Sequence, residues 1–428
     1  MWENALEQGG YAGAWISAGQ QSFYFQDDHG PKFQPNPNLA QWVDPKFLTP
    51  DSHLLIQAGD RPILFLHTPR DYWHAPAPLP DYLAPSVDVR TFSSQAALWA
   101  ACKQANANKR HMAHITQVYA DAEYLGDLNP PSIVDYVHFH RAQKTAYEQA
   151  AMRAASDIAT AGHIAAAEKF TQGCSEFEIH MAYLQASQQT ERDLPYGNIV
   201  ALNEHASILH YQHQEQQHVL PARSFLIDAG GLYRGYASDI TRTYVHQGTQ
   251  HEDFAQLLLD MEQHQLELIN SITCGKTFAE LHVQMHQQLG KVLAANGIVT
   301  CTAEAAFERG ITEKFCPHGL GHLLGLQVHD VGGHLANAQG QAAPPPPQYP
   351  MLRFTRAIAA NQIFTIEPGI YFIPMLLAAL ATEKAPVNWS KVEALKGYGG
   401  IRIEDNVKVL EVGVENLTRD AFARIIHD

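Results

Sequence analysis

Between residues 145 and 297, capping patterns, an alanine-rich run and glycine stop signals predict four helices. The predicted helices cover residues 145–170, a segment that begins at Ser175, residues 252–272 and residues 277–296. Three of them open on Thr/Ser-x-x-Glu, a pattern in which two side chains satisfy free amides of the first turn. Glycines at 173 and 297 end the first and the last of these helices.

Strand-like apolar runs lie between and after these helices, at residues 224–229, 239–245, 362–367 and 400–409. Helices and strands segregate along this part of the chain instead of alternating. This order favours an α+β domain over a doubly wound sheet. We expect this domain to cover residues 141–428.

Residues 1–140 are expected to form a separate domain of mixed α/β character. Apolar runs at 53–57 and 63–67 flank Gly-Asp-Arg-Pro and predict two strands around a tight turn. Residues 26–50 are rich in Pro, Asn and Asp and predict a long surface loop. A polyproline stretch at 342–350 predicts a stiff surface loop, with an SH3-type ligand as the alternative.

Composition narrows the class of protein. The 428 residues are 46% hydrophobic and 17% charged, which indicates an ordinary soluble globular protein of two or three domains. A net charge of −15 without any basic run argues against a nucleic-acid partner. Five scattered cysteines without a C-x-x-C pair predict a reducing, cytoplasmic setting. No signal peptide is visible at the N-terminus, and the most apolar segment is too short to span a membrane.

Four carboxylates stand in strand-like surroundings, where a buried charge is costly unless it is paired or coordinates a metal. Asp228 ends an apolar run before a glycine turn and Asp239 begins the returning strand, so a hairpin brings them together. Glu367 ends another strand, directly before a proline that prevents its continuation. Arg402 and Glu404 share one face of the last predicted strand, because side chains alternate with period two.

Three histidines, His318, His322 and His329, fall within twelve residues among glycines and aliphatic residues. Neutral imidazole is the commonest metal ligand of protein side chains. Four carboxylates in one core repel one another unless cations are present. Four carboxylates with one imidazole suit two divalent ions that prefer oxygen ligands, and among these we favour Mn²⁺.

Five motifs, in this order along the chain, resemble those of the pita-bread metallopeptidases: Phe-Leu-Ile-Asp-Ala-Gly, Ser-Asp-Ile-Thr-Arg-Thr, His-Gly-Leu-Gly-His-x6-His, Thr-Ile-Glu-Pro-Gly-Ile-Tyr and Gly-Ile-Arg-Ile-Glu-Asp-Asn. That family includes methionine aminopeptidase, aminopeptidase P and prolidase. The resemblance covers essentially the whole chain and is greatest to bacterial Xaa-Pro dipeptidases (prolidases), including enzymes also called organophosphorus acid anhydrolases. It implies a creatinase-like N-terminal domain at 1–140 and a pita-bread catalytic domain at 141–428.

The resemblance also implies a role for each matching residue. The implied metal ligands are Asp228, Asp239, His322, Glu367 and Glu404, with Asp239 and Glu404 bridging two ions. His322 is implied in place of His318 because the family's ligand lies seven residues before the Val-His-Asp histidine, here His329. The implied substrate-side residues are His210, His318, His329, Arg402, Tyr196 and Tyr371.

The expected reaction is hydrolysis of Xaa-Pro dipeptides by a hydroxide that bridges two metal ions. Glu367 is expected to act as general base and to pass the proton to the proline nitrogen. His329, with His318, is expected to stabilise the tetrahedral oxyanion. We also expect hydrolysis of organophosphorus triesters as a side activity, and a homodimer in which residues 26–44 of one chain cover the partner's site.

Recognition of the substrate's terminal carboxylate distinguishes a dipeptidase from aminopeptidase P, the main alternative. Arg353 resembles the prolidase arginine that holds this carboxylate, a task suited to a planar guanidinium, although Phe354 stands where a smaller residue is common. A surface arginine, or Arg356 in its place, remains open.

Other classes of protein fit the motifs less well. His318-x-x-x-His322 lacks the glutamate of the zincin motif, and Gly319-x-Gly321 lacks the third glycine of a dinucleotide site. A non-catalytic peptide-binding module of the same fold would be expected to have lost ligands, and here all five are present.

Overall fold

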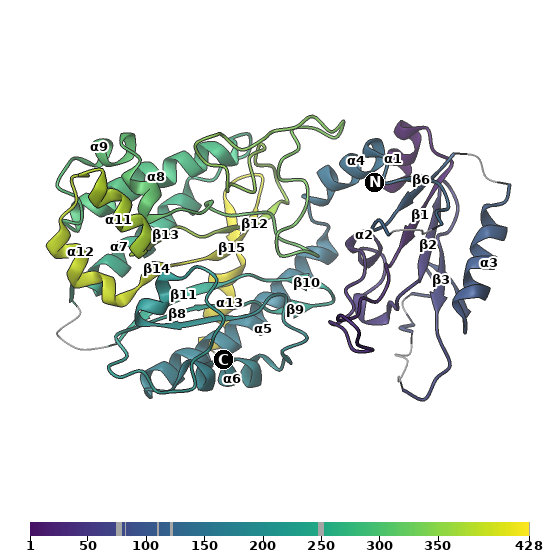
Figure 1. Ribbon diagram of the computed structural model, residues 1–428. Coiled ribbons are helices and arrows are strands. Elements are labelled where there is room, and N and C mark those ends of the chain that lie inside the picture. Colours follow the sequence, from purple (N-terminus) through teal and green to yellow (C-terminus); the bar gives the residue numbers. More distant parts are fainter. Residues whose placement is uncertain (74–78, 82, 109–110, 120–122, 247–251, 428) are drawn as a thin grey trace. The chain divides into compact units, whose positions relative to one another are not determined.

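The computed structural model describes all residues except 74–78, 82, 109–110, 120–122, 247–251 and 428 (Figure 1). Residues Met1–Arg141 and Leu335–Ala342 form one compact unit, and Ala142–His334 and Ala343–Asp428 form a second. The segment 335–342, which lies inside the expected second domain, therefore groups with the first unit.

A mixed sheet forms the centre of the first unit. In the described residues its six strands have the order β4-β3-β2-β1-β5-β6, with β1–β2–β3 antiparallel and the outer pairs parallel. The strands are β1 (Gly13–Ser17), β2 (His53–Gln57), β3 (Ile63–His67), β4 (Asp88–Phe92), β5 (Met112–Ile115) and β6 (Asp127–Leu128). The helices are α1 (Trp2–Gly9), α2 (Pro37–Ala40), η1 (Pro45–Phe47), α3 (Gln95–Asn106) and α4 (Pro131–Arg141). The predicted pair at 53–57 and 63–67 is confirmed as β2 and β3.

Both faces of this sheet are covered. Ala14 and Ile16 of β1 pack in an apolar cluster with α1 and α4, whereas Trp15 between them packs in a cluster with α3. A strand buried on both faces has no polar face, so the alternation that marks a half-buried strand is missing.

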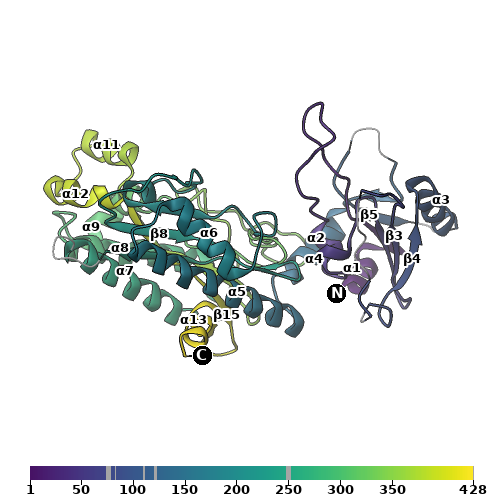
Figure 2. The ribbon, with the colours of Figure 1, turned by 90° about the horizontal axis from the view of Figure 1, so that it is seen from below.

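Helix pairs and short sheets build the second unit (Figure 2). Its helices are α5 (Ala146–Thr171), α6 (Glu176–Ser187), η2 (Asn203–Ser207), α7 (Glu252–Asn270), α8 (Phe278–Ala295), α9 (Ala303–Glu308), α10 (Ile311–Phe315), α11 (Pro374–Thr382), α12 (Trp389–Leu395), η4 (Lys396–Tyr398) and α13 (Leu417–His427). Its strands are β7 (Ile199–Leu202), β8 (Ser224–Asp228), β9 (Leu232–Tyr233), β10 (Tyr236–Ala237), β11 (Thr241–Val245), β12 (Ile363–Ile366), β13 (Gly369–Tyr371), β14 (Gly400–Arg402), β15 (Asp405–Val409) and β16 (Val414–Asn416).

Each main sheet of this unit rests on a pair of helices. Helices α5 and α6 bury apolar side chains against β7 and β8 of the sheet β11-β8-β7. Helices α7 and α8 do the same for β12 and β15 of the sheet β12-β15-β16. The predicted capping boxes are confirmed at the starts of α5, α6 and α8, where serine or threonine and glutamate bond each other's backbone amides.

Two predictions from local sequence are wrong. The loop expected at 26–50 contains α2 and η1 and buries Leu39 and Val43, because apolar residues among its prolines reach the core of the first unit. The single strand expected at 400–409 is broken between β14 and β15, which pair with different strands. The break falls at Ile403 and Glu404, and the carboxylate of Glu404 lies in it.

Candidate active site

Thr241 is the point at which the segments that carry the carboxylates meet. Its backbone pairs with Asp228 in the β8–β11 hairpin and, on its other side, forms a β-bridge with Glu404. Asp239 lies two residues before Thr241, just outside β11. The hydroxyl of Thr241 donates to Glu404 Oε2 at 2.7 Å.

The hairpin brings Asp228 and Asp239 together, as the sequence predicts. The Tyr196 hydroxyl lies 2.8 Å from Asp228 Oδ1 and 2.5 Å from Asp239 Oδ1. A hydroxyl carries one proton, which these two carboxylate oxygens must share. Tyr196 thus contacts both carboxylates but does not line the cavity described below.

His322 is attached to strand β12 by two backbone contacts. Its amide donates to the Thr365 hydroxyl at 3.1 Å, and the Thr365 amide donates to its carbonyl at 3.0 Å. A Cβ on Gly321 would stand 2.0 Å from the Thr365 carbonyl oxygen, so only glycine permits this approach. The same Thr365 hydroxyl lies 3.2 Å from Glu367 Oε1.

The imidazole of His322 faces the carboxylates. Its Nδ1 donates to the Leu323 carbonyl at 3.0 Å, and Nε2 lies 3.4 Å from Asp239 Oδ2 and 3.6 Å from Glu367 Oε1. A hydrogen bond at one ring nitrogen fixes the tautomer that leaves the other as a metal ligand. One ligand atom from each of Asp239, His322 and Glu404 lies within 4.8 Å of the others, and all three residues are buried.

The charges at this cluster fit a cationic centre. Burial, reinforced by Asp239, Glu367 and Asp228, raises the pKa of Glu404 well above its ordinary range. Burial also raises the pKa of Glu367 to about 7, although His322 opposes the shift. Carboxylates that cannot all ionise together in a buried site are stabilised as anions by a bound cation. The oxygen-rich donor set with one imidazole therefore fits divalent metal ions.

A hydrogen-bonded chain runs from Asp228 to His318. Arg402 donates from Nη2 to Asp228 Oδ2 at 2.7 Å and from Nη1 to the Tyr371 hydroxyl at 3.0 Å. The Tyr371 hydroxyl in turn lies 2.9 Å from His318 Nε2, while His318 Nδ1 is 2.8 Å from the Gly319 carbonyl. Because Nδ1–H donates to that carbonyl, Nε2 accepts the hydrogen of Tyr371, and both nitrogens of His318 are occupied.

A cavity of about 230 Å³ opens above the cluster. Its lining includes Asp228, Asp239, Glu367, Glu404, His210, His318, His322, His329, Arg353 and Arg402. The ring of His329 stands perpendicular to that of His322 at a centroid distance of 4.4 Å and has no hydrogen-bond partner in the described part of the chain. His329 is exposed to the cavity, and desolvation by the surrounding wall, with a smaller effect of His322, lowers its pKa to about 4. His329 is therefore the neutral imidazole whose nitrogens are available to a bound molecule.

The two candidate arginines for the substrate carboxylate occupy different places. Arg353 is exposed and lines the cavity. Arg356 is buried, does not line the cavity and lies 3.4 Å from the Gly332 carbonyl. Of the two, the structure brings only Arg353 to the site.

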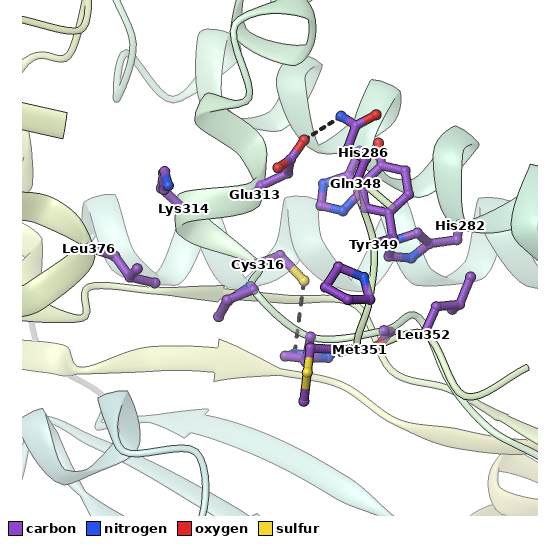
Figure 3. Close-up of a pocket in the computed structure, with 14 residues that line it drawn as sticks. His282, His286, Glu313, Lys314, Cys316, Gln348, Tyr349, Met351, Leu352 and Leu376 are labelled. Carbon is purple, nitrogen blue, oxygen red and sulfur yellow. Dashed lines mark hydrogen bonds between the residues drawn. The ribbon is translucent and has the colours of Figure 1, made fainter. Parts of the chain in front are cut away.

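A second cavity of about 190 Å³ shares Pro317, His318, Gly319 and Met351 with the first. Figure 3 shows Cys316 below the stacked rings of His286 and Tyr349, with Leu376 on the opposite side. Cys316 Sγ lies 3.8 Å from His318 Nε2. The segment 316–319 therefore separates two cavities.

Sequence reasoning did not identify Thr241, Thr365 and Asn406, which support the cluster. The Asn406 side chain bonds both the amide and the carbonyl of Asp239. Each of these residues stands two positions from a predicted ligand, at 239, 367 or 404. A search of the polar positions two residues from each predicted ligand could therefore have found them.

The comparisons with known proteins agree on one family. Residues 150–411 match the sequence profile described as metallopeptidase family M24, and residues 1–139 match the profile described as Xaa-Pro dipeptidase, N-terminal domain. An Xaa-Pro dipeptidase of Aeromonas hydrophila is 44% identical over 423 residues, 97% of this chain and 94% of that protein. An Xaa-Pro dipeptidase of Yersinia pestis is 42% identical over 413 residues, 95% and 92% of the two chains.

Solved structures of similar fold include a zinc-substituted aminopeptidase P of Escherichia coli in complex with product, with a TM-score of 0.73 and 22% identity over 97% of this chain and 94% of that one. The proline aminopeptidase P II of Yersinia pestis has a TM-score of 0.72 and 23% identity over 97% and 95%. These findings confirm the predicted α+β fold class, with an N-terminal domain before the pita-bread domain. The chain therefore belongs to metallopeptidase family M24, in the branch that carries the Xaa-Pro dipeptidase N-terminal domain.

Proposed function

We propose that this chain is a metal-dependent dipeptidase that hydrolyses Xaa-Pro dipeptides. The observation that carries the proposal is the cavity of about 230 Å³, whose lining combines four carboxylates and His322 with an arginine, Arg353. Identity of 42–44% to Xaa-Pro dipeptidases over nearly the whole chain supports the choice of substrate.

The residues proposed to hold the metal are Asp228, Asp239, His322, Glu367 and Glu404. Five ligands of which four are carboxylates would hold two ions per chain, and an oxygen-rich set favours Mn²⁺. When bound, such ions polarise a carbonyl and lower the pKa of water toward ~7. Metal analysis of the reconstituted protein should approach two ions per chain, and one zinc without a second site would contradict this count.

Glu367 is proposed to move the proton during hydrolysis. Its Oε1 is within 3.2 Å of the Thr365 hydroxyl, and Oε2 lies 3.8 Å from His318 Nδ1, whose hydrogen is directed to Gly319. Oε2 is therefore the oxygen we assign as acceptor of a proton from water and donor to the proline nitrogen.

His329 is proposed to donate a hydrogen bond to the oxyanion of the tetrahedral intermediate. Its position on the cavity wall and its lack of a partner in the described residues support this role. His318, with both nitrogens occupied, is proposed instead to position the wall through Tyr371 and Arg402. This proposal replaces the expectation that His318, together with His329, stabilises the oxyanion.

Arg353 is proposed to bind the terminal carboxylate of the dipeptide, with His210 on the same cavity wall. Arg353 is exposed, so the relevant scale is that of one hydrogen bond to a charged group, ~1.5–3 kcal/mol. We therefore expect Arg353→Ala to lose most affinity for Ala-Pro and much less for Ala-Pro-amide. Arg309 is an exposed arginine that does not line the cavity, so it provides the control. Arg309→Ala should leave the affinities for Ala-Pro and for Ala-Pro-amide unchanged.

The decisive assay compares Ala-Pro, Ala-Pro-amide and Ala-Pro-Ala with the wild-type protein. Strong preference for Ala-Pro supports the dipeptidase. Comparable activity on Ala-Pro-Ala would favour aminopeptidase P, the fold of the solved neighbours. No hydrolysis of any of the three by metal-loaded protein would favour a peptide-binding module.

Two further proposals come from the resemblance described above. Organophosphorus triester hydrolysis is proposed as a side activity, and a measured preference for triesters over every Xaa-Pro dipeptide would reverse that ranking. We also propose a homodimer in which residues 26–44 cover the partner's site, and a fully active monomer by light scattering would exclude it.

No helix in the described ranges has the length and apolar character needed to cross a membrane.

A further inference from the structure

The loop between β7 and β8 brings Leu209 and His210 to the wall of the active-site cavity. Leu209 is half-buried and His210 is exposed. After the 3-10 turn η2 at its start, the described residues 208–223 contain no helix or strand. The place of His210 therefore depends on what holds the loop at its two ends.

One carboxylate holds both ends. Glu176, the first residue of α6, has no exposed surface and accepts four hydrogen bonds. The donors on the side before His210 are the Leu202 amide at 2.8 Å and His205 Nδ1 at 2.7 Å. The donors on the side after it are the Tyr211 hydroxyl at 2.7 Å and the Glu215 amide at 2.9 Å.

The four donors are divided evenly between the two oxygens. Oε1 accepts from the segment that enters the loop, and Oε2 accepts from the segment that leaves it. The rings of His205 and Tyr211 also stack on each other, with centroids 4.5 Å apart. A buried carboxylate with four donors is fully satisfied, and removal of its charge leaves donors without acceptors.

We propose that Glu176 is a positioning residue that sets the place of His210 against the substrate. Glu176 does not line the cavity, so it acts through the loop that it closes. This inference rests on the proposed function in one respect, namely that His210 contacts the dipeptide. It adds a specificity determinant that lies outside the motifs of the metal site.

Glu176→Gln tests this inference because glutamine keeps the shape of the side chain. Its amide group presents two hydrogens to donors that need an acceptor, so one end of the loop is released. We expect KM for Ala-Pro to rise about tenfold while kcat stays within about threefold, since the proton-transfer groups are untouched.

A matched control is available at the start of α5. Glu148 is also a buried first-turn carboxylate, and it accepts from the Thr145 amide and hydroxyl and from the Tyr236 hydroxyl. It has no contact with the loop 203–215 in the described structure. Glu148→Gln should lower the melting temperature as Glu176→Gln does but leave KM unchanged.

The double variant Glu176→Gln/His210→Ala separates positioning from general destabilisation. If Glu176 acts through His210, the double variant should have the KM of His210→Ala alone, because the effects are not additive. If the increases in KM of the two single variants multiplied in the double variant, the inference would be overturned. Should Glu176→Gln fail to fold, Tyr211→Phe removes one of the four donors and should raise KM about threefold.

Hydrogen exchange gives a readout that does not depend on activity. Amides of residues 203–215 should exchange faster in Glu176→Gln than in wild type or Glu148→Gln, since the loop is released locally. Unchanged exchange in this segment would overturn the inference even if KM rises. Wild-type protein without activity on Ala-Pro would instead refute the proposed function and leave the exchange result as the test of Glu176.

Discussion

At the scale of single residues, proton transfer is assigned to Glu367 and orientation to its neighbours. Glu367→Gln keeps the size of the side chain but cannot accept a proton, so kcat should fall by about 10²–10⁴-fold. The measurement is the steady-state rate with Ala-Pro at equal metal content. Glu411 is an exposed glutamate and provides the control: Glu411→Gln should have the same steady-state rate as the wild type.

If Glu367→Gln retained near-normal turnover with both ions bound, the assignment of Glu367 as proton acceptor would be wrong. A variant that lost metal as well as turnover would indicate that its role as a ligand dominates. Metal analysis of the same samples separates the two results.

Asp330, the residue that follows His329 in the chain, forms a buried ion pair with Lys144. Lys144 Nζ lies 2.6 Å from Asp330 Oδ2, and both side chains are 1% exposed. Lys144→Met takes a directly bonded cation away from a buried carboxylate, so it should destabilise the protein by ~3–5 kcal/mol. Denaturant unfolding is the measurement, and Lys144→Met/Asp330→Leu should recover part of the loss.

The exposed pair of Lys396 and Glu393 provides the control. Lys396 is 52% exposed, and solvent screens its interaction. Lys396→Met should change stability by less than ~0.5 kcal/mol. Equal losses in the two lysine variants would mean that the Lys144 pair contributes no more than a surface pair.

At the scale of elements, the contact between α5 and α6 depends on a glycine inside a helix. A Cβ on Gly162 would lie 2.5 Å from the ring of Tyr183, whose hydroxyl donates to the Gly230 carbonyl at 2.9 Å. Because Gly230 follows the Asp228 strand, this contact connects helix packing to the hairpin of the site.

Gly162→Ala should lower the melting temperature, although alanine favours helices by ~1 kcal/mol over glycine. Overpacking of a fitted contact costs ~1–3 kcal/mol and outweighs that gain. In the background Tyr183→Ala the ring is absent, and the same substitution should become stabilising. A stabilising effect in the wild-type background would contradict the close packing of α5 on α6.

Some local sequence patterns predicted the bounds of helices and strands correctly, and others did not. Three capping boxes predicted the starts of α5, α6 and α8, because capping involves residues only three positions apart. The break between β14 and β15 was not predicted, because it arises from pairing with β13 on one side and β12 on the other. Continuous apolar sequence does not distinguish one long strand from two.

At the scale of the whole molecule, buried neutral histidines should make stability depend on pH. Burial lowers the pKa of His53 to about 3 and of His114 to about 4 in the first unit, and of His264 and His286 to about 4 in the second. Unfolded histidine titrates near ~6.5, so below that pH the unfolded chain binds more protons than the folded one.

Stability should therefore be complete above pH ~6.5 and fall as the pH decreases toward the folded values, by about 1.4 kcal/mol per histidine per pH unit. Calorimetry at pH 7.5 and 5.5 should show a clear loss of melting temperature. His264→Gln should reduce that difference. An unchanged pH difference in His264→Gln would show that His264 is not buried as a neutral imidazole.

Local sequence by itself determined much of this protein: the helix starts, the β2–β3 and β8–β11 pairs, and the order of motifs that indicates the family. These features depend on residues close together in the chain or on short ordered patterns. Tertiary structure decided that Arg353 and not Arg356 lines the cavity, and that His318 has no free nitrogen. It also decided that Glu176 closes the loop of His210. Each of these outcomes depends on hydrogen bonds or burial between segments distant in the chain, and no local pattern encodes them.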